Sequence, residues 1–245
     1  MSRTGTYVAS VSAARRELDS GAENLSAAEV IAWGVETFGD RIALACSLGA
    51  EDMVLADMLS RIAAGARVFT LDTGRLHKET QDLLERARER FDLRFEVYSP
   101  DAAAVAALAE AHGRDPFYKS VELRKLCCEV RKMAPLRRAL SGLDAWICGL
   151  RREQAVTRKD IQKIEKDAPP GGLCKLNPLA DWTEDQVWDY IRGHDVPYND
   201  LHDRGFPSIG CAPCTRAVQP GEDVRAGRWW WELPEQKECG LHVRR

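Results

Sequence analysis

Two pairs of cysteines place the strongest constraint on how this chain can fold. Cys127 and Cys128 are adjacent in LCCEVRK, and Cys211 and Cys214 form a CxxC motif in SIGCAPCTR. Four thiolates that meet in space are suited to an iron–sulfur cluster or to zinc. Zinc ribbons use two CxxC halves, and the adjacent pair departs from that spacing, so a cluster is favoured over zinc. Buried thiols or a disulfide are the alternatives to a shared site.

The cysteine content also bears on the cellular compartment. The chain of 245 residues contains eight cysteines, and its N-terminus lacks the apolar core of a signal peptide. We therefore expect a reducing cytoplasm, where clustered thiols bind metals or catalyse reactions rather than cross-link the chain. The net charge of −3 does not favour a nucleic-acid partner, and no apolar run is long enough to predict a membrane span. The oligomeric state cannot be inferred from these features.

Strand-like and helix-like segments alternate along the first two thirds of the chain. Short apolar runs predict buried strands over residues 41–47, 67–72, 94–98 and 144–150. Helical patterns separate these runs, including an alanine-rich helix over residues 101–112. This alternation predicts an α/β fold with a doubly wound, mostly parallel sheet that binds ligands at the carboxyl ends of its strands.

Several local signals refine this outline. Ser26 and Thr183 each stand three residues before a Glu or Gln, as in the capping box that begins a helix. Pro135 should bend or restart the basic helix that contains the first cysteine pair. The charged residues 159–172 end in Pro-Pro-Gly-Gly and predict a mobile surface loop. We divide the chain into a nucleotide-binding α/β domain, 1–210, with the first cysteine pair and a C-terminal segment, 211–245, with the second.

The loop after the first predicted strand has the geometry of a phosphate site. It reads Ser47-Leu-Gly49-Ala-Glu51-Asp52 and leads directly into a helix. Backbone N–H groups and the positive end of a helix dipole can hold a phosphate at such a junction. The signal is weak by itself, because any turn between a strand and a helix can contain serine and glycine.

Ordered sequence blocks from about Ser26 to His242 resemble one family. They are SLGAED, LDTG, CCEVRKMAPLRRAL, GLRREQAVTR, PLADWTEDQVWDYI, SIGCAPCTR, AGRWWWE and KECGLH. They are similar to the assimilatory adenylylsulfate reductases of the APS/PAPS reductase family. The resemblance implies an adenine nucleotide α-hydrolase-like (PP-loop) fold with a mobile C-terminal tail. The ATP pyrophosphatases of that superfamily have Ser-Gly-Gly-x-Asp-Ser where this chain has residues 47–52, which argues against ATP cleavage and is compatible with nucleotide binding.

The reaction that the resemblance implies is the thioredoxin-dependent reduction of adenosine 5′-phosphosulfate (APS) to sulfite and AMP, in sulfate assimilation and cysteine biosynthesis. The nucleophile would be Cys239 in KECGLH, since a thiolate is a soft and strong nucleophile. Lys237 and His242 would favour its thiolate form. Attack on sulfur gives an S-sulfocysteine, from which thioredoxin or a similar dithiol releases sulfite.

The resemblance also assigns the remaining site residues. One 4Fe–4S cluster with a structural and electrostatic role would be held by Cys127, Cys128, Cys211 and Cys214. The anionic substrate would be bound by Ser47, Gly49, Lys132, Arg158, Arg225 and Arg228. Lys132 lies four residues after Cys128, so the two share a face of a regular helix. Asp72 and Thr73 are assigned to the ribose or adenine pocket. Cys46 and Cys148 lie in apolar predicted strands, which favours packing in the core.

The substrate can be narrowed further. Family members with both cysteine pairs use APS, and the acidic Glu51 and Asp52 would repel the additional 3′-phosphate of PAPS. A PAPS reductase is one alternative. A cluster-containing PP-loop enzyme of tRNA thiolation is another, and ATP consumption would support it. A zinc-stabilised binding module is a third, which would be colourless and would not require Cys239.

Overall fold

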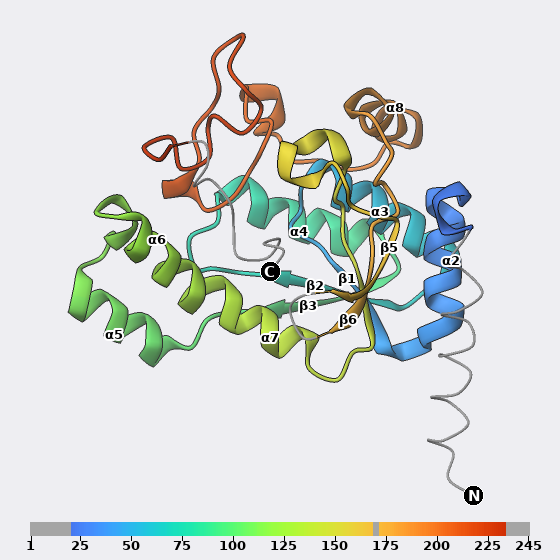
Figure 1. Ribbon diagram of the computed structural model, residues 1–245, viewed down its shortest axis with the longest axis horizontal. Coiled ribbons are helices and arrows are strands. Elements are labelled where there is room, and N and C mark those ends of the chain that lie inside the picture. The colour runs from blue at the N-terminus through green and yellow to red at the C-terminus, as the bar shows by residue number, and fades with distance from the viewer. Residues whose placement is uncertain (1–20, 169–171, 234–245) are drawn as a thin grey trace, which may run out of the picture.

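A six-stranded sheet forms the centre of the molecule, with strand order β3-β2-β1-β4-β6-β5 (Figure 1). The computed structural model describes residues 21–168 and 172–233. The strands are β1 Ile42–Ala45, β2 Ala66–Leu71, β3 Leu93–Tyr98, β4 Ala145–Ile147, β5 Ile164–Ala168 and β6 Leu173–Leu176. All neighbouring strands pair in parallel except β5, which is antiparallel to β6. The predicted α/β class and mostly parallel sheet are confirmed.

Helices cover both faces of this sheet. They are α2 Ala27–Phe38, α3 Ala50–Ile62, α4 Lys78–Arg90, α5 Ala102–His112, α6 Val121–Cys128, α7 Ala134–Leu140 and α8 Glu184–His194. Figure 1 shows the sheet between α3 and α4 on one side and α7 on the other. Successive side chains of a strand point to opposite faces, so Leu44 joins the core beneath α3 whereas Ala43 joins the core beneath α7. The sheet is therefore doubly wound, as predicted.

The helix signals in the sequence are also borne out. Capping boxes are present at Ser26 and Thr183, each with reciprocal side-chain and backbone hydrogen bonds. The basic helix is interrupted as Pro135 predicts: α6 ends at Cys128, a π-helical turn covers Glu129–Met133, and α7 begins at Ala134. None of the helices in the parts of the chain that the structure describes is long and apolar enough to cross a membrane.

The expectation of a surface loop over residues 159–172 was wrong for part of that segment. Strand β5 lies within it and pairs with β6 to close one edge of the sheet. The buried Lys175 of β6 contacts Glu165 of β5 through its Nζ, 3.3 Å from Oε2, and lies 5.8 Å from the ring centre of Trp146. Lys175 and Glu165 thus compensate each other's charge between the two strands.

The order of the strands determines where a ligand can enter. The chain runs from β1 to β2 and β3 on one side and then returns to β4 on the other side of β1. The loops that follow β1 and β4 therefore diverge at a topological switch point, where a crevice forms outside the carboxyl ends of the strands.

Candidate active site

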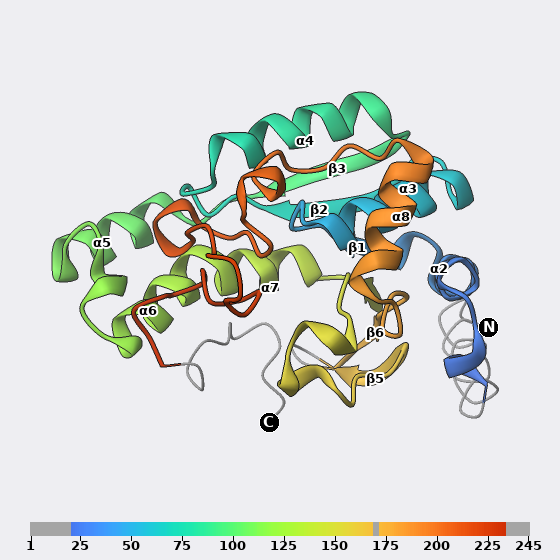
Figure 2. The same cartoon turned by 90° about the horizontal axis from the view of Figure 1, so that it is seen from above.

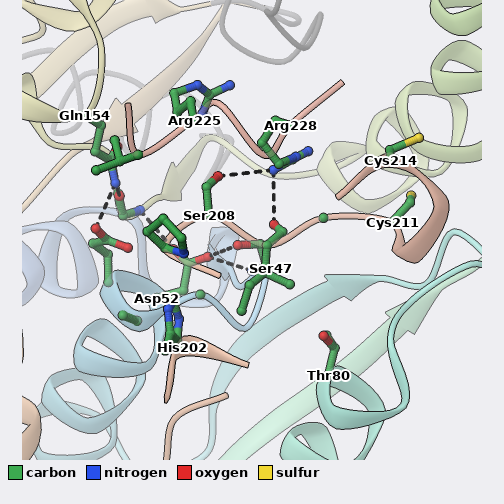
Figure 3. A pocket seen from close by; sticks show the side chains of 18 of the residues that line it. Ser47, Asp52, Thr80, Gln154, His202, Ser208, Cys211, Cys214, Arg225 and Arg228 are labelled. Atoms are coloured by element: carbon green, nitrogen blue, oxygen red, sulfur yellow. Dashed lines mark hydrogen bonds between the residues drawn. The ribbon is translucent and has the colours of Figure 1, made fainter. Parts of the chain in front are cut away.

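A cavity of about 1040 Å³ lies at this switch point. It is bordered by the loops after β1, β2 and β4, by the cysteine-containing end of α6, and by the segment 202–229 (Figure 3). Its lining includes Ser47, Gly49, Lys132, Arg158, Arg225, Arg228 and the cysteines Cys127, Cys128, Cys211 and Cys214. The structure thus brings together the substrate-binding and metal-ligating residues that the sequence predicts. Cys239, the predicted nucleophile, lies outside the described residues.

The loop after β1 is organised by Asp52. The backbone N and the Oγ of Ser47 both donate to Asp52 Oδ2, at 2.7 and 2.6 Å, and the N–H of Gly149 donates to Oδ1 at 3.1 Å. Leu48 adopts a positive φ of 62° while its side chain is buried in the core. Burial raises the pKa of Asp52 to about 6, although the hydrogen bonds from Ser47 act in the opposite direction. Asp52 thereby ties the loop after β1 to the loop after β4.

The loop after β4 is held in place through Gln154. Glu51 accepts hydrogen bonds from Arg151 Nε and Gln154 Nε2, each at 2.9 Å. The other amide atom of Gln154, Oε1, accepts from the guanidinium of Arg158. This chain of contacts orients a predicted substrate-binding arginine, and nothing in the sequence singled out Gln154. Because Arg151 compensates the charge of Glu51, Glu51 is less suited to repel a 3′-phosphate than the sequence suggested.

Cys127 and Cys214 are buried in one cluster with Phe117 and Trp229, and the partly buried Cys128 and Cys211 pack against it. All four are free thiols, so the disulfide alternative is not realised. Burial and the neighbouring thiols, Cys211 and Cys128, raise the pKa of Cys214. No group of three or more His, Cys, Asp or Glu residues within the described ranges is spaced to hold a single metal ion.

The loop after β2 forms a further wall of this cysteine cluster. The hydroxyl of Thr73 lies 3.1 Å from Cys211 Sγ, and its carbonyl accepts from Arg131 Nη1 at 2.9 Å. The backbone N–H of Ala212 donates to the carbonyl of Arg75 at 2.8 Å. Thr73, which the sequence assigned to the ribose or adenine pocket, lines the cavity, and its hydroxyl also contacts the second cysteine pair.

Two predicted cations connect the cysteine cluster to the cavity. Lys132 lies in the π-helical turn after Cys128, which widens the regular four-residue spacing, and both residues still line the cavity. Arg228 Nη1 donates to the carbonyl of Ile209 at 3.1 Å and approaches Ser208 Oγ at 3.4 Å (Figure 3). Positive charge is therefore placed between the four thiols and the loop after β1.

His202 is a cavity residue that the sequence analysis did not select. It lines the cavity near Asp52 (Figure 3), and its Nε2 is buried with no hydrogen-bond partner in the described part of the chain. Burial lowers the pKa of this imidazole. A neutral ring at this position suits contact with an uncharged part of a ligand.

Comparisons with known proteins give a consistent answer. Residues 41–217 match the model of the phosphoadenosine phosphosulfate reductase domain. The adenosine 5′-phosphosulfate reductase of Allochromatium vinosum is 57% identical over 205 residues, covering 84% of this chain and 80% of the relative. The enzyme of the same name from Burkholderia cepacia is 52% identical over 204 residues, covering 83% and 81%.

Solved structures agree with this match. The phosphoadenylyl-sulfate reductase of Candida auris, in a phosphate complex, has a TM-score of 0.70 and 28% identity, covering 83% of this chain and 95% of its own. Yeast FAD synthetase has a TM-score of 0.55 at 13% identity, covering 78% of this chain and 66% of its own, and shares the fold alone.

Proposed function

The chain belongs to the phosphoadenosine phosphosulfate reductase family, and from this we propose that it reduces APS to sulfite and AMP with electrons from thioredoxin or a similar dithiol protein. The observation that carries the proposal is the single cavity that contains the loop after β1, the arginines and all four clustered cysteines. The names of the relatives from A. vinosum and B. cepacia support APS as the substrate.

The predicted substrate contacts divide between the two ends of the cavity. Ser47 and Gly49 precede α3, whose first-turn N–H groups and positive dipole end suit the α-phosphate. Lys132, Arg158, Arg225 and Arg228 provide positive charge for the sulfate and for the negative charge that develops on the leaving phosphate. Gln154 would act by orienting Arg158.

In the proposed chemical step, Cys239 is the nucleophile. Its thiolate attacks the sulfur of APS, a sulfur–sulfur bond forms, and the bond from sulfur to the phosphate oxygen breaks, so that AMP leaves with the electron pair. A thiol of the partner then attacks the Cys239 sulfur and displaces sulfite. The second thiol of the partner resolves the mixed disulfide, and the partner leaves oxidised. Both electrons thus come from the partner dithiol.

The four clustered cysteines would hold one 4Fe–4S cluster. Zinc requires its sulfurs at about 2.3 Å from a single point, whereas a cluster of four irons spreads its cysteines around a larger body. All four cysteines pack in one core, and their adjacent pair departs from the spacing of a zinc ribbon, which favours the cluster. When bound, the cluster supplies a fixed, polarisable charge beside the cations that hold the sulfate. Thr73 and Arg131 lie beside the cysteines, and Lys132 lines the same cavity.

Anaerobic incubation with APS, followed by intact-mass analysis and peptide mapping, tests the proposal. We expect a sulfonate adduct on Cys239 that thioredoxin releases as sulfite. The variant C239S should retain the metal and form no adduct. An enzyme that keeps its metal but acquires no adduct from APS would exclude the thiol mechanism, and ATP-dependent sulfur transfer would then be examined.

Two further measurements separate the alternatives. The same incubation with PAPS decides substrate choice, because a strict APS reductase forms the adduct only with APS. Visible absorbance and metal analysis distinguish a brown iron–sulfur protein from a colourless zinc protein. Iron at four atoms per chain, as a 4Fe–4S cluster requires, is the expected result.

A further inference from the structure

A buried ion pair joins the helix of the first cysteine pair to the C-terminal segment. Arg124 of α6 donates from Nε to Glu232 Oε1 at 3.0 Å and from Nη2 to Oε2 at 2.7 Å. The two side chains are only 1% and 2% exposed. A bidentate pair of this kind is geometrically specific, and it spans 108 positions of the sequence.

An indole ring lies beside this ion pair. The guanidinium carbon of Arg124 is 4.6 Å from the ring centre of Trp229, and that of Arg228 is 4.9 Å from it. Trp229 is buried, and its backbone N–H donates to the carbonyl of Cys214 at 3.1 Å. The N–H of Glu232 donates to the carbonyl of Trp229 at 2.8 Å. The ion pair is thus connected through Trp229 to the second cysteine pair.

The other end of the connection is the first cysteine pair. Arg124 stands three and four residues before Cys127 and Cys128 on α6, so the three residues share one side of the helix. The charge of Arg124 interacts with Cys128 and with Glu232. The route from Cys128 through Arg124, Glu232 and Trp229 to Cys214 therefore consists of direct contacts between the two halves of the cysteine cluster.

The same contacts fix the point from which the chain continues to Cys239. Glu232 precedes Cys239 by seven residues in the sequence. Seven residues span at most about 25 Å when fully extended, so the position of Glu232 limits where the Cys239 sulfur can reach.

We propose that Arg124 and Glu232 are positioning residues whose ion pair, packed on Trp229, holds Cys214 in register with Cys127 and Cys128 and fixes the origin of the chain that leads to Cys239. This inference rests on the proposed function for its catalytic half. Its metal-retention half depends only on the described contacts. Neither residue needs to touch the substrate.

A buried ion pair often stabilises a protein no more than two apolar side chains would. Stability alone therefore does not explain the Arg124–Glu232 pair, and a positioning role does. Two well-packed apolar side chains are often as stabilising as a buried ion pair, whereas removing one partner leaves an uncompensated charge. The bidentate geometry and the flanking indole supply what an apolar pair lacks, namely a defined distance and orientation between the two segments.

The test compares three variants with a matched control. E232Q removes one charge, R124K keeps the charge but loses the bidentate fork, and the double variant R124M/E232M replaces the whole pair with apolar groups. D144N is the control, because Arg41 and Asp144 form a bidentate pair of 2.6 and 2.7 Å that spans 103 positions and lies next to the start of β4, away from the cysteines. Metal release to a chelator, measured as iron and zinc, and thermal stability are recorded for each.

We expect E232Q to release its metal at least about tenfold faster than the wild type, and D144N to match the wild type. R124K should be intermediate. The double variant should regain thermal stability, because it leaves no uncompensated buried charge. It should still release its metal quickly, because the two segments lose the fixed orientation that the ion pair gives them. Adduct formation on Cys239 at saturating APS should slow in E232Q, with a KM within about twofold of wild type.

Two results would overturn the inference. One is metal release from the double variant at the wild-type rate, which would show that the geometry of the ion pair is not needed to hold the cysteines in place. The other is an E232Q that matches D144N in metal release and in adduct formation. If E232Q does not fold, R124K and the double variant decide. If the wild type forms no adduct with APS, the proposed function is contradicted. The order of metal-release rates among the variants would still test the role of the Arg124–Glu232 ion pair.

Discussion

At the scale of single residues, Asp52 shows how burial and hydrogen bonding compete at one carboxyl group. Three donors, two from Ser47 and one from Gly149, stabilise its charged form. Burial opposes them and prevails, so its pKa rises to about 6 from an ordinary 3.8. The proton is therefore bound more tightly in the folded protein than in the unfolded chain. Such a group contributes stability below pH 3.8 and loses that contribution as the pH rises through about 6.

We predict that the free energy of unfolding of the wild type falls relative to that of D52N as the pH rises. The shift from 3.8 to about 6 corresponds to roughly 3 kcal/mol across this interval. Urea unfolding of both proteins at about pH 4, 5, 6 and 7 measures the difference, and groups common to both proteins cancel. A difference that stays constant with pH would show that Asp52 does not titrate in this range.

At the scale of elements, the loop after β4 depends on one amide that bridges two charged groups. Gln154 joins Glu51 at the start of α3 to Arg158 at the end of the loop. We predict that Q154L lowers kcat/KM for APS by roughly tenfold or more, mainly through KM, because a hydrogen bond to a charged group is lost at each end. Steady-state sulfite release measures the effect.

The control for this variant is Q81L, which makes the same substitution at an exposed position of α4. It should leave both kinetic constants unchanged. If Q154L behaves like Q81L, then Arg158 is oriented by other contacts or does not bind the substrate.

The cap of α2 offers a test that leaves the cavity untouched. Ser26 Oγ accepts from the N–H of Glu29, and Glu29 Oε2 accepts from the N–H of Ser26 at 2.7 Å. We predict that S26A lowers the free energy of unfolding by about 1 kcal/mol, whereas S26T, which keeps the hydroxyl, loses less. Chemical denaturation measures both. Equal losses in the two variants would mean that the hydroxyl does not cap the helix.

The elements that the sequence predicted are those whose signals are local. The alternating apolar runs around Leu44, Val68 and Ile147 predicted three central strands, because burial of these strands depends on their own side chains. The β5–β6 hairpin was missed because Lys175 and Glu165 are paired with each other across the two strands, and Lys175 also lies over the ring of Trp146. No local sequence pattern predicts the pairing of Lys175 with Glu165.

The same distinction holds for the cavity. The cysteine motifs and the family resemblance selected cysteines and arginines that the structure places on the lining of this cavity. The contacts of Thr73 with Cys211 and of Gln154 with Arg158 arise only where separate loops meet. Neither residue type demands such a partner, so the sequence did not predict the contact of Thr73 with Cys211 and did not select Gln154.

At the scale of the whole molecule, the described residues form three apolar cores, of which two stabilise the sheet and one lies at the candidate site. One core lies on each face of the sheet, built around Leu44 and Trp146 respectively. The third contains Cys127, Cys214 and Trp229 and lies away from the sheet. The orange-red segment after residue 200 lies beside α6 in both views (Figures 1 and 2) and contributes to this third core and to the cavity wall.

This division predicts the consequence of removing the metal. The two sheet cores contain no cysteine of the cluster, so the apoprotein should keep its sheet and unfold cooperatively. If the proposed cluster is bound, the third core would lose the group that the thiolates of its four cysteines hold. Its segments, residues 116–133 and 205–233, should therefore become the least protected of the described regions. Hydrogen exchange of the holo and apo forms measures this, with β1, β2 and β4 as internal controls. Loss of protection in those central strands would mean that the metal stabilises the whole fold rather than the site alone.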